Sequence, residues 1–309
     1  MTYEDAEVHL MQQRSPYLPL AGGVIAVSFA AVFIKLAAAP SLVIASYRML
    51  FAWLMLMPVA LWKSRDELRK ITRRDLLLMI CAGVSLALHF ATWISSFRFT
   101  TVASSTVLVS MQPIFAVVFS WLLFREGISR RQLAAIAIAV AGSIVIGLAD
   151  VSSEATRSAS LWGNTLALLG AVFAAVYFLC GKAIRRNVPL LPYVSIVYGV
   201  SALTLIAVTV SSGIGLHAYG PHDYLLFLGL AVVCTVVGHS TLNWALAHLP
   251  TAAVGVAVLG EPIGATVWAM ALFAEIPSGG QLLGGGLLLA GILLFMLPAR
   301  VKASKESTP

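Results

Sequence analysis

Long apolar stretches alternate with short polar or proline-containing breaks along almost the whole chain. Each stretch has about 20 residues, enough for a helix to cross a hydrocarbon core of roughly 30 Å. The short alternating segments of a membrane β-barrel are absent from the pattern, so we expect an all-α, polytopic membrane protein. The pattern predicts ten membrane-spanning helices, at about 17–37, 41–62, 76–97, 101–124, 131–149, 161–183, 190–212, 223–247, 251–273 and 280–298.

The second half of the chain repeats the first. The stretch from Gln112-Pro113-Ile114 to Ala141-Gly142 aligns without a gap with the stretch from Glu261-Pro262-Ile263 to Ala290-Gly291. Five spans per half is an odd number, so the second half enters the membrane from the opposite side and the repeats are inverted. Two related halves are the usual construction of a secondary transporter, with the substrate site between them. The predicted organisation is a tail (1–16), a first repeat (17–149), a linker (150–160), a second repeat (161–298) and a tail (299–309).

Lys and Arg residues gather in the loops on one side of the predicted helices. With the amino terminus inside, only Arg98 and Arg157 fall in outer loops. The positive-inside rule therefore predicts a multi-pass protein of the cytoplasmic (inner) membrane with both termini cytoplasmic. Ala37-Ala38-Ala39 resembles a signal-peptidase site, but the acidic amino-terminal tail lacks a basic n-region, so we expect the first span to be retained.

Composition narrows the class further. The chain is 60% hydrophobic and 11% charged, whereas about a quarter of the residues of a soluble domain are charged. The net charge of +7 lies in short loops, which favours lipid contact and topology over nucleic-acid binding. Cys81, Cys180 and Cys234 lie in apolar segments without metal-ligand spacing, so we expect buried hydrophobic side chains and no metal. Motifs for nucleotide, zinc or serine-hydrolase chemistry are absent from the sequence, which predicts neither a cofactor nor an enzyme.

The order of the motifs resembles a known family. The first half contains Phe33-Ile34-Lys35-Leu36, then Tyr47-Arg48, then Val107 to Pro113 leading to Trp121-Leu122-Leu123-Phe124-Arg125-Glu126, and then Ala141-Gly142. This series resembles the EamA family of the drug/metabolite transporter superfamily over nearly the whole chain. The resemblance implies ten helices in two five-helix repeats, and a transporter, often an exporter, of small metabolites such as amino acids or of drug-like compounds. The second half departs from it at Val197 and Ala274, which stand where Arg48 and Arg125 would repeat.

Ionisable side chains at membrane depth are functional candidates, because a charge there costs at least ~2.5–3.5 kcal/mol on insertion scales. Glu261 lies near the middle of the ninth predicted span and directly precedes Pro262, so we expect the helix to bend or open there. Its carboxyl group could carry a proton, as a proton-coupled antiporter requires. The alternative is a fixed ion pair with Lys35, Arg48 or a histidine.

Gln112-Pro113 is the counterpart of Glu261-Pro262, which predicts that the fourth and ninth spans face each other across a central cavity and kink at Pro113 and Pro262. Gln112 could hydrogen-bond a substrate or another helix. Arg48 could hold a substrate carboxylate or pair with an acid, although we favour a snorkelling residue near the helix end. The same interpretations apply to Lys35, with snorkelling favoured more strongly.

His89 and His239 occupy equivalent places in the third and eighth spans. Trp93 and Asn243 follow them by one helical turn, so each pair shares a helix face. A proton relay is one interpretation, and a neutral histidine bonded to a backbone carbonyl is the alternative that we favour. Asn243 and Trp244 could line the pathway, with Trp244 offering a flat surface to a cation or a ring.

Two groups of residues have structural interpretations. Glu126 and Glu275 end equivalent motifs at the membrane surface, where a favourable interaction with a helix N-terminus is expected. The last span is rich in glycine, which permits close helix packing within the fold or at the seam of a homodimer. These glycines are Gly279, Gly280, Gly284, Gly285, Gly286 and Gly291.

The sequence therefore predicts an alternating-access secondary transporter that exports a small metabolite such as an amino acid, with protons as the candidate coupling ion. Its expected partners are a small-molecule substrate, membrane lipids and, as a candidate, a second copy of the chain, but no nucleic acid. One alternative is a facilitative uniporter or importer of sugars or nucleotide conjugates. A non-transporting membrane receptor or enzyme would need a reactive cluster or an exposed domain, and the sequence shows neither.

Overall fold

The computed structural model describes residues 16–124, 129–150, 154–185, 187–249 and 251–296. Every regular element within these ranges is a helix, which confirms the all-α class. In this part of the chain nine helical segments are long and apolar enough to cross a membrane, and Val102–Ala116 is a shorter apolar segment. The chain is therefore a multi-pass membrane protein.

The helices of the first half follow the predicted spans, with one short helix added and two spans divided. The first span is divided at Phe29 and the fourth at Ser110 and Met111. In chain order the helices are α2 (Tyr17–Ser28), α3 (Ala30–Leu36), α4 (Ser41–Lys63), α5 (Arg65–Arg69), α6 (Arg73–Ser96), α7 (Val102–Val109), α8 (Gln112–Phe124) and α9 (Arg130–Ala149).

The helices of the second half show a division of the ninth span that matches the division of the fourth. The middle of the eighth span is wound as a π-helix, η1, which the sequence pattern did not predict. In chain order the helices are α10 (Glu154–Ile184), α11 (Leu190–Ser211), α12 (Pro221–Gly229), η1 (Leu230–His239), α13 (Ser240–His248), α14 (Thr251–Val258), α15 (Gly260–Phe273) and α16 (Gly279–Met296).

The last helices of the two halves begin in the same way. At the start of α9, Ser129 Oγ accepts a hydrogen bond from Gln132 N, and Gln132 Oε1 accepts one from Ser129 N. At the start of α16, Ser278 and Gln281 make the same reciprocal pair, at 3.2 and 2.8 Å. Such a capping box satisfies backbone N–H groups that have no partner within the helix. The repeat in the sequence is thus also a repeat of local structure.

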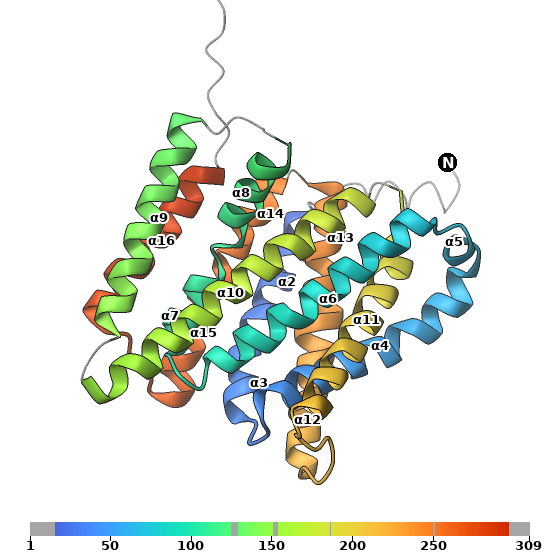
Figure 1. Ribbon diagram of the computed structural model, residues 1–309, viewed down its shortest axis with the longest axis horizontal. Helices are drawn as coiled ribbons and strands as arrows, with labels where there is room; N and C mark the ends of the chain where they lie inside the picture. Colours follow the sequence, from blue (N-terminus) through green and yellow to red (C-terminus); the bar gives the residue numbers. More distant parts are fainter. Residues whose placement is uncertain (1–15, 125–128, 151–153, 186, 250, 297–309) are drawn as a thin grey trace, which may run out of the picture.

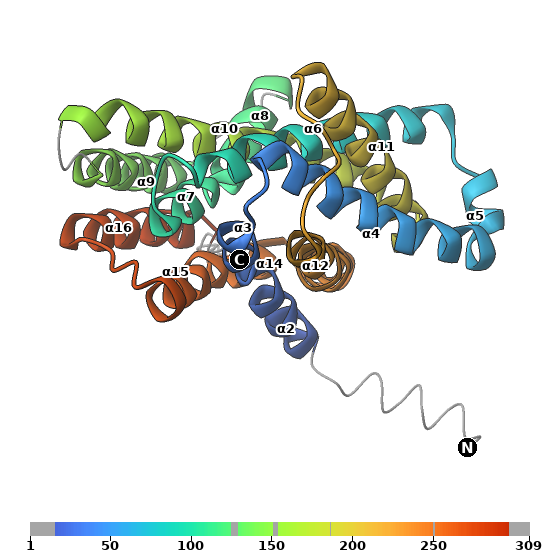
Figure 2. The ribbon, with the colours of Figure 1, turned by 90° about the horizontal axis from the view of Figure 1, so that it is seen from below.

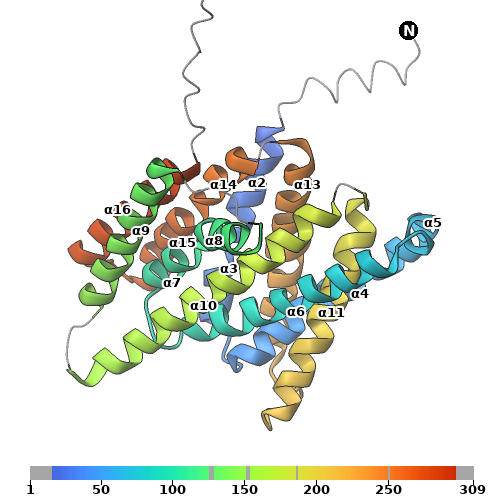
Figure 3. The same cartoon turned by 45° about the horizontal axis from the view of Figure 1, so that its top comes forward.

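Three helix pairs, each with one member from either half, make the most extensive contacts: α6 with α10, α9 with α16, and α4 with α11. Figures 1 and 3 show α9 beside α16 at one side of the molecule and α4 beside α11 at the other. Figure 2 shows α6 and α10 on one side of the middle, and α2, α12 and α15 on the opposite side. The centre of the molecule is therefore enclosed by elements of both halves.

The contact between α9 and α16 depends on glycine. A Cβ atom on Gly142 would lie 2.5 Å from Leu288 N and 2.6 Å from Gly284 O. A Cβ atom on Gly291 would lie 2.7 Å from Ala139 N. Gly284 and Gly291 therefore serve close packing within the fold, which is one of the two interpretations drawn from the sequence.

The expectation of three buried cysteines is only partly met. Cys234 is buried and Cys180 is partly buried, but Cys81 is exposed on the surface of α6. An apolar helix in a membrane presents one face to lipid rather than to protein, so hydropathy alone does not reveal which of its residues are buried.

Candidate functional site

The fourth and ninth spans are interrupted at equivalent positions. Helix α7 ends at Val109 and α8 begins at Gln112, while α14 ends at Val258 and α15 begins at Gly260. The two prolines, Pro113 and Pro262, lie in the first turns of α8 and α15, where a missing N–H breaks no helical hydrogen bond. The fourth and ninth spans are thus divided just before the Gln-Pro and Glu-Pro motifs.

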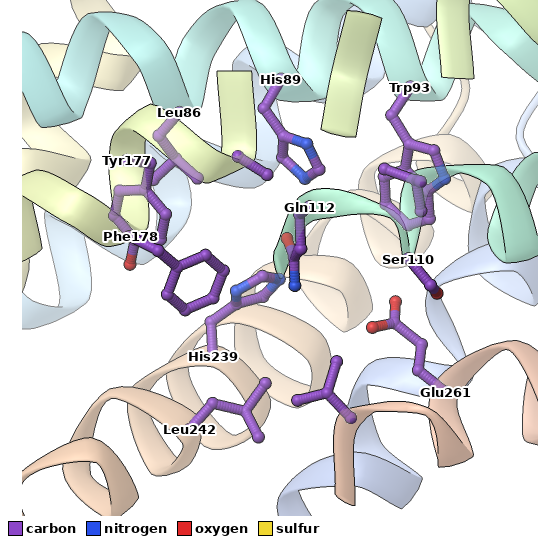
Figure 4. Close-up of a pocket in the computed structure, with 13 residues that line it drawn as sticks. Leu86, His89, Trp93, Ser110, Gln112, Tyr177, Phe178, His239, Leu242 and Glu261 are labelled. Carbon is purple, nitrogen blue, oxygen red and sulfur yellow. The ribbon is translucent and has the colours of Figure 1, made fainter. Parts of the chain in front are cut away.

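A cavity lies between these two interruptions and is lined by residues from α6, α10, η1 and α13 as well (Figure 4). Its volume is about 30 Å³, measured as the space open to the centres of water molecules. A single water needs roughly 10–15 Å³ in this measure, so the cavity has room for about two waters. Five residues that the sequence singled out line it together: His89, Trp93, Gln112, His239 and Glu261.

Glu261 is the acidic residue of this cavity. It lies in the first turn of α15, where the partial positive charge of the helix N-terminus favours a carboxylate. Figure 4 shows its carboxyl group pointing toward Ser110, with Gln112 nearby. No Lys, Arg or His nitrogen lies within 4 Å of it in the part of the chain that the structure describes. The alternative of an ion pair with Lys35 is wrong for this structure, because Lys35 Nζ lies 2.6 Å from Glu275 Oε2.

The two histidines have different surroundings. His89 is buried, stacks on Trp93 with a ring-centroid distance of 5.7 Å, and has its Nδ1 2.9 Å from Gly170 O. Since a carbonyl oxygen only accepts, Nδ1 carries the proton in this bond, which is the arrangement favoured from the sequence. The His239 ring makes no hydrogen bond within the described residues and faces the cavity between Gln112 and Phe178 (Figure 4).

Asn243 reaches the cavity indirectly. Its Nδ2 donates to Tyr177 Oη at 2.9 Å and to His239 O at 2.8 Å. Tyr177 lines the cavity, so Asn243 holds a lining side chain rather than lining it directly. Trp244 does not line the cavity and stacks on His248, with a ring-centroid distance of 4.4 Å.

Arg48 is fully buried, so the favoured interpretation of a snorkelling residue is wrong. Its Nε donates to Thr235 Oγ1 at 2.9 Å, and its guanidinium carbon lies 4.0 Å from the centroid of the Phe90 ring. Both terminal nitrogens are buried without a hydrogen-bond partner in the described part of the chain. Thr235 lies in the middle of η1 and bonds back to Leu230 O, five residues earlier. Thr235, within the π-helix, therefore supplies the acceptor that holds Arg48.

One end of the bundle is closed by a polar network centred on Asp150. Its Oδ1 accepts hydrogen bonds from Ser104 Oγ at 2.9 Å and Gln281 Nε2 at 2.6 Å. Its Oδ2 accepts bonds from Asn164 Nδ2 at 2.7 Å and Thr100 Oγ1 at 3.2 Å. The donors come from both halves of the chain, so this carboxylate ties the halves together. We call this end of the molecule the Asp150 end.

A second link between the halves lies at the same end. Glu275 Oε2 pairs with Lys35 at the end of α3, and Glu275 Oε1 accepts a bond from Val102 N at the start of α7 at 2.6 Å. A carboxylate at a helix N-terminus was expected for Glu275, but the helix is α7 of the other half rather than the following helix. Its counterpart Glu126 lies outside the described residues.

Among the polar and aromatic residues that line the cavity, three were not predicted from the sequence: Ser110, Tyr177 and Phe178. Ser110 lies at the interruption between α7 and α8, and the other two lie in the last third of α10. Tyr177 had one signal, since it stands opposite Phe33 in the weaker part of the repeat and adds a hydroxyl group to an apolar stretch.

The geometry is that of a membrane-embedded cavity between two related halves. The model of the EamA-like transporter family matches residues 15–148 and again residues 161–297. The chain belongs to the EamA-like transporter family. Because the same family model matches each half, it accounts for the repeat in the sequence and for the matching interruptions. Transport is therefore the general function of the chain.

The relatives of this EamA-like transporter are distant but extend over most of its length. "Uncharacterized transporter YetK" of Bacillus subtilis (strain 168) is 22% identical over 318 residues, covering 95% of this chain and 96% of that protein. The "Probable amino-acid metabolite efflux pump" of Salmonella typhimurium (strain LT2) is 24% identical over 311 residues, covering 94% and 98%. The "Probable terminal-alkyne amino-acid exporter" of Streptantibioticus cattleyicolor is 25% identical over 224 residues, covering 67% and 68%. One solved crystal structure has the same fold, with a TM-score of 0.63 at 16% identity over 90% of this chain and 95% of that chain.

Proposed function

We propose that this EamA-like transporter is a proton-coupled secondary exporter of small amino-acid-like metabolites that works by alternating access. It would lie in the cytoplasmic membrane with both termini cytoplasmic, as the distribution of Lys and Arg favours. Two relatives that carry amino-acid export or efflux in their names support the substrate class.

The observation that carries the proposal is the carboxyl group of Glu261. It lies inside a membrane-embedded cavity, has no cationic partner within 4 Å in the described chain, and faces hydrogen-bonding groups of the other half. A carboxylate without a cation is costly in a low-dielectric site, so gaining a proton or a cationic group there relieves that cost. A proton and the amino group of an amino acid can each relieve that cost. Because both bind the same carboxyl group, they compete for it, and this competition couples proton movement to substrate movement.

The closed state of the cavity supports alternating access. Space for about two waters is too small for an amino acid, so substrate entry requires the surrounding helices to separate. The Asp150 end is held by links between the halves, and the charge distribution assigns this end to the outside. In this interpretation the structure is a state that is closed to the outside, and export requires these links to break.

The test is substrate flux in proteoliposomes with an imposed pH gradient, after counterflow screening of amino acids and cationic compounds. We expect the gradient to drive accumulation of at least one amino-acid-like compound by the wild type. Glu261→Gln should abolish this pH dependence while the protein remains folded and inserted. Glu67→Gln, in the short helix α5, which has no buried residues, is the matched control and should behave as wild type.

Two outcomes would contradict the proposal. Flux that follows the substrate gradient and ignores pH would indicate facilitated transport, as in a uniporter or importer of sugars or nucleotide conjugates. Undiminished proton-coupled flux in Glu261→Gln would remove this carboxyl group from the mechanism.

A further inference from the structure

The guanidinium group of Arg48 is a buried cation near the cavity whose N–H donors mostly lack acceptors among the described residues. A guanidinium group has five N–H donors, and here only Nε has an acceptor. No carboxylate oxygen lies within 4 Å of it in the described residues. Leaving buried charged donors unpaired costs more than a typical hydrogen bond contributes. Such a cation is expected to have a partner in some state of the protein.

Phe90 separates this cation from the cavity. The guanidinium carbon of Arg48 lies over the Phe90 ring, 4.0 Å from its centroid. The same ring contacts three aromatic side chains that line the cavity: His239 at 5.6 Å, His89 at 4.8 Å and Trp93 at 6.4 Å between centroids. A shift of this one ring, or of α6 that carries it, would expose the vacant nitrogens of Arg48 to the cavity.

The cavity wall offers a further vacant donor. Trp93 Nε1 is buried without a hydrogen-bond partner in the described part of the chain, and Trp93 lines the cavity. Vacant donors on Arg48 and Trp93, with Glu261 across the cavity, make a site with complementary charges.

We propose that Arg48 is the binding site for the carboxylate of the transported substrate, reached when Phe90 moves aside, while Glu261 takes its cationic amino group. The substrate class is then a zwitterionic amino acid rather than an amine or a neutral amide. This assignment rests on the proposed function and adds the group that recognises the second charge. The fork of guanidinium donors matches a carboxylate in a bidentate geometry, which an ammonium group does not reproduce.

The transport test compares leucine with leucinamide, which lacks the carboxylate, in proteoliposomes of the full chain. Leucinamide cannot form the charge-assisted hydrogen bonds between the substrate carboxylate and Arg48. Losing such bonds lowers flux by about 10- to 100-fold, so the wild type should transport leucine faster than leucinamide by that ratio. Arg48→Met should reduce the ratio to about two-fold or less, and Arg48→Lys should retain part of it. Lys63→Met removes a cation over Trp62 at 5.5 Å and is the control, with an unchanged ratio. An equal preference in the wild type, or an unchanged ratio in Arg48→Met, would overturn the assignment.

A binding test on purified protein separates this assignment from the transport mechanism. We expect 4-methylpentanoate, but not the isosteric 4-methylpentanamide, to raise the thermal unfolding temperature of the wild type. Phe90→Leu should strengthen this effect because it uncovers the cation, and Arg48→Met should remove it. Stabilisation that persists in Arg48→Met, or is absent from both the wild type and Phe90→Leu, would overturn the assignment. If the effect is present but flux ignores pH, the carboxylate site stands and only the proposed proton coupling fails.

Discussion

Replacing Gly142 with alanine tests the packing that holds the two halves together at α9 and α16. The added Cβ would lie 2.5–2.6 Å from backbone atoms of α16, whereas ordinary van der Waals contacts are 3.4–4 Å. Backbone atoms cannot rotate away as a side chain does, so the helices must separate by roughly 1 Å. Gly142→Ala is therefore expected to be destabilising, although alanine is the better helix former.

The magnitude follows from two opposing effects. Overpacking costs about 1–3 kcal/mol, and a clash with backbone favours the upper part of that range. The change from glycine to alanine inside a helix contributes about 0.5–1 kcal/mol in the opposite direction. The expected net loss is about 2 kcal/mol. At roughly 2–4 °C per kcal/mol, the thermal midpoint should fall by about 4–8 °C.

The matched control lies in the same helix. A Cβ on Gly147 would meet nothing within 4 Å, so Gly147→Ala keeps only the helix-forming gain and should unfold at or slightly above the wild-type temperature. The assay is thermal unfolding in one detergent, followed by intrinsic fluorescence at a fixed scan rate, because membrane proteins often unfold irreversibly. A Gly142→Ala protein as stable as Gly147→Ala would refute the close approach of α9 and α16.

Three further substitutions test other parts of the structure. Asp150→Asn removes charge-assisted acceptors from the network at the Asp150 end. It should lower the free energy of unfolding by about 2–3 kcal/mol, measured as a lower unfolding temperature. The control is Asp66→Asn, at a side chain that is 81% exposed, and it should show no change. Arg48→Met removes a buried unpaired charge, so its unfolding temperature should equal or exceed that of the wild type; a fall would indicate a structural role instead. Asn243→Leu leaves the hydroxyl group of Tyr177 without its partner and should cost about 1–3 kcal/mol. The double variant with Tyr177→Phe should lose less than the sum of the single variants, measured by a double-mutant cycle in the same unfolding assay.

Several features of the fold and site are predictable because they depend on neighbouring residues. Runs of about 20 apolar residues predict helices, since backbone groups in lipid must bond within the segment. The alignment of the two halves places Gln112-Pro113 opposite Glu261-Pro262, which predicted that these two motifs would face the same cavity. The capping box of Ser129 and Gln132 is a local feature of the same kind, since it is formed within one turn.

Other features were not predictable, because they depend on partners far away in the sequence. Arg48 is eight positions into its helix, and hydropathy alone does not distinguish snorkelling from burial against Thr235 and Phe90. Lys35 and Glu275 are 240 residues apart, and their pairing exists only because the two halves pack against each other. The π-helix also depends on tertiary contacts, since its apolar sequence is compatible with an ordinary α-helix.

The sequence by itself thus determined that this chain is an all-α, multi-pass membrane protein of a transporter family with two related halves, and which polar groups lie within its apolar segments. Only the tertiary structure decided which of them share a cavity, which hold one another, and which remain without a partner. The physical reason is that helix formation in a membrane is a local requirement of the backbone. The partner of a buried charge is instead set by the packing of distant segments, and among the described residues that packing leaves both Arg48 and Glu261 without an ion-pair partner.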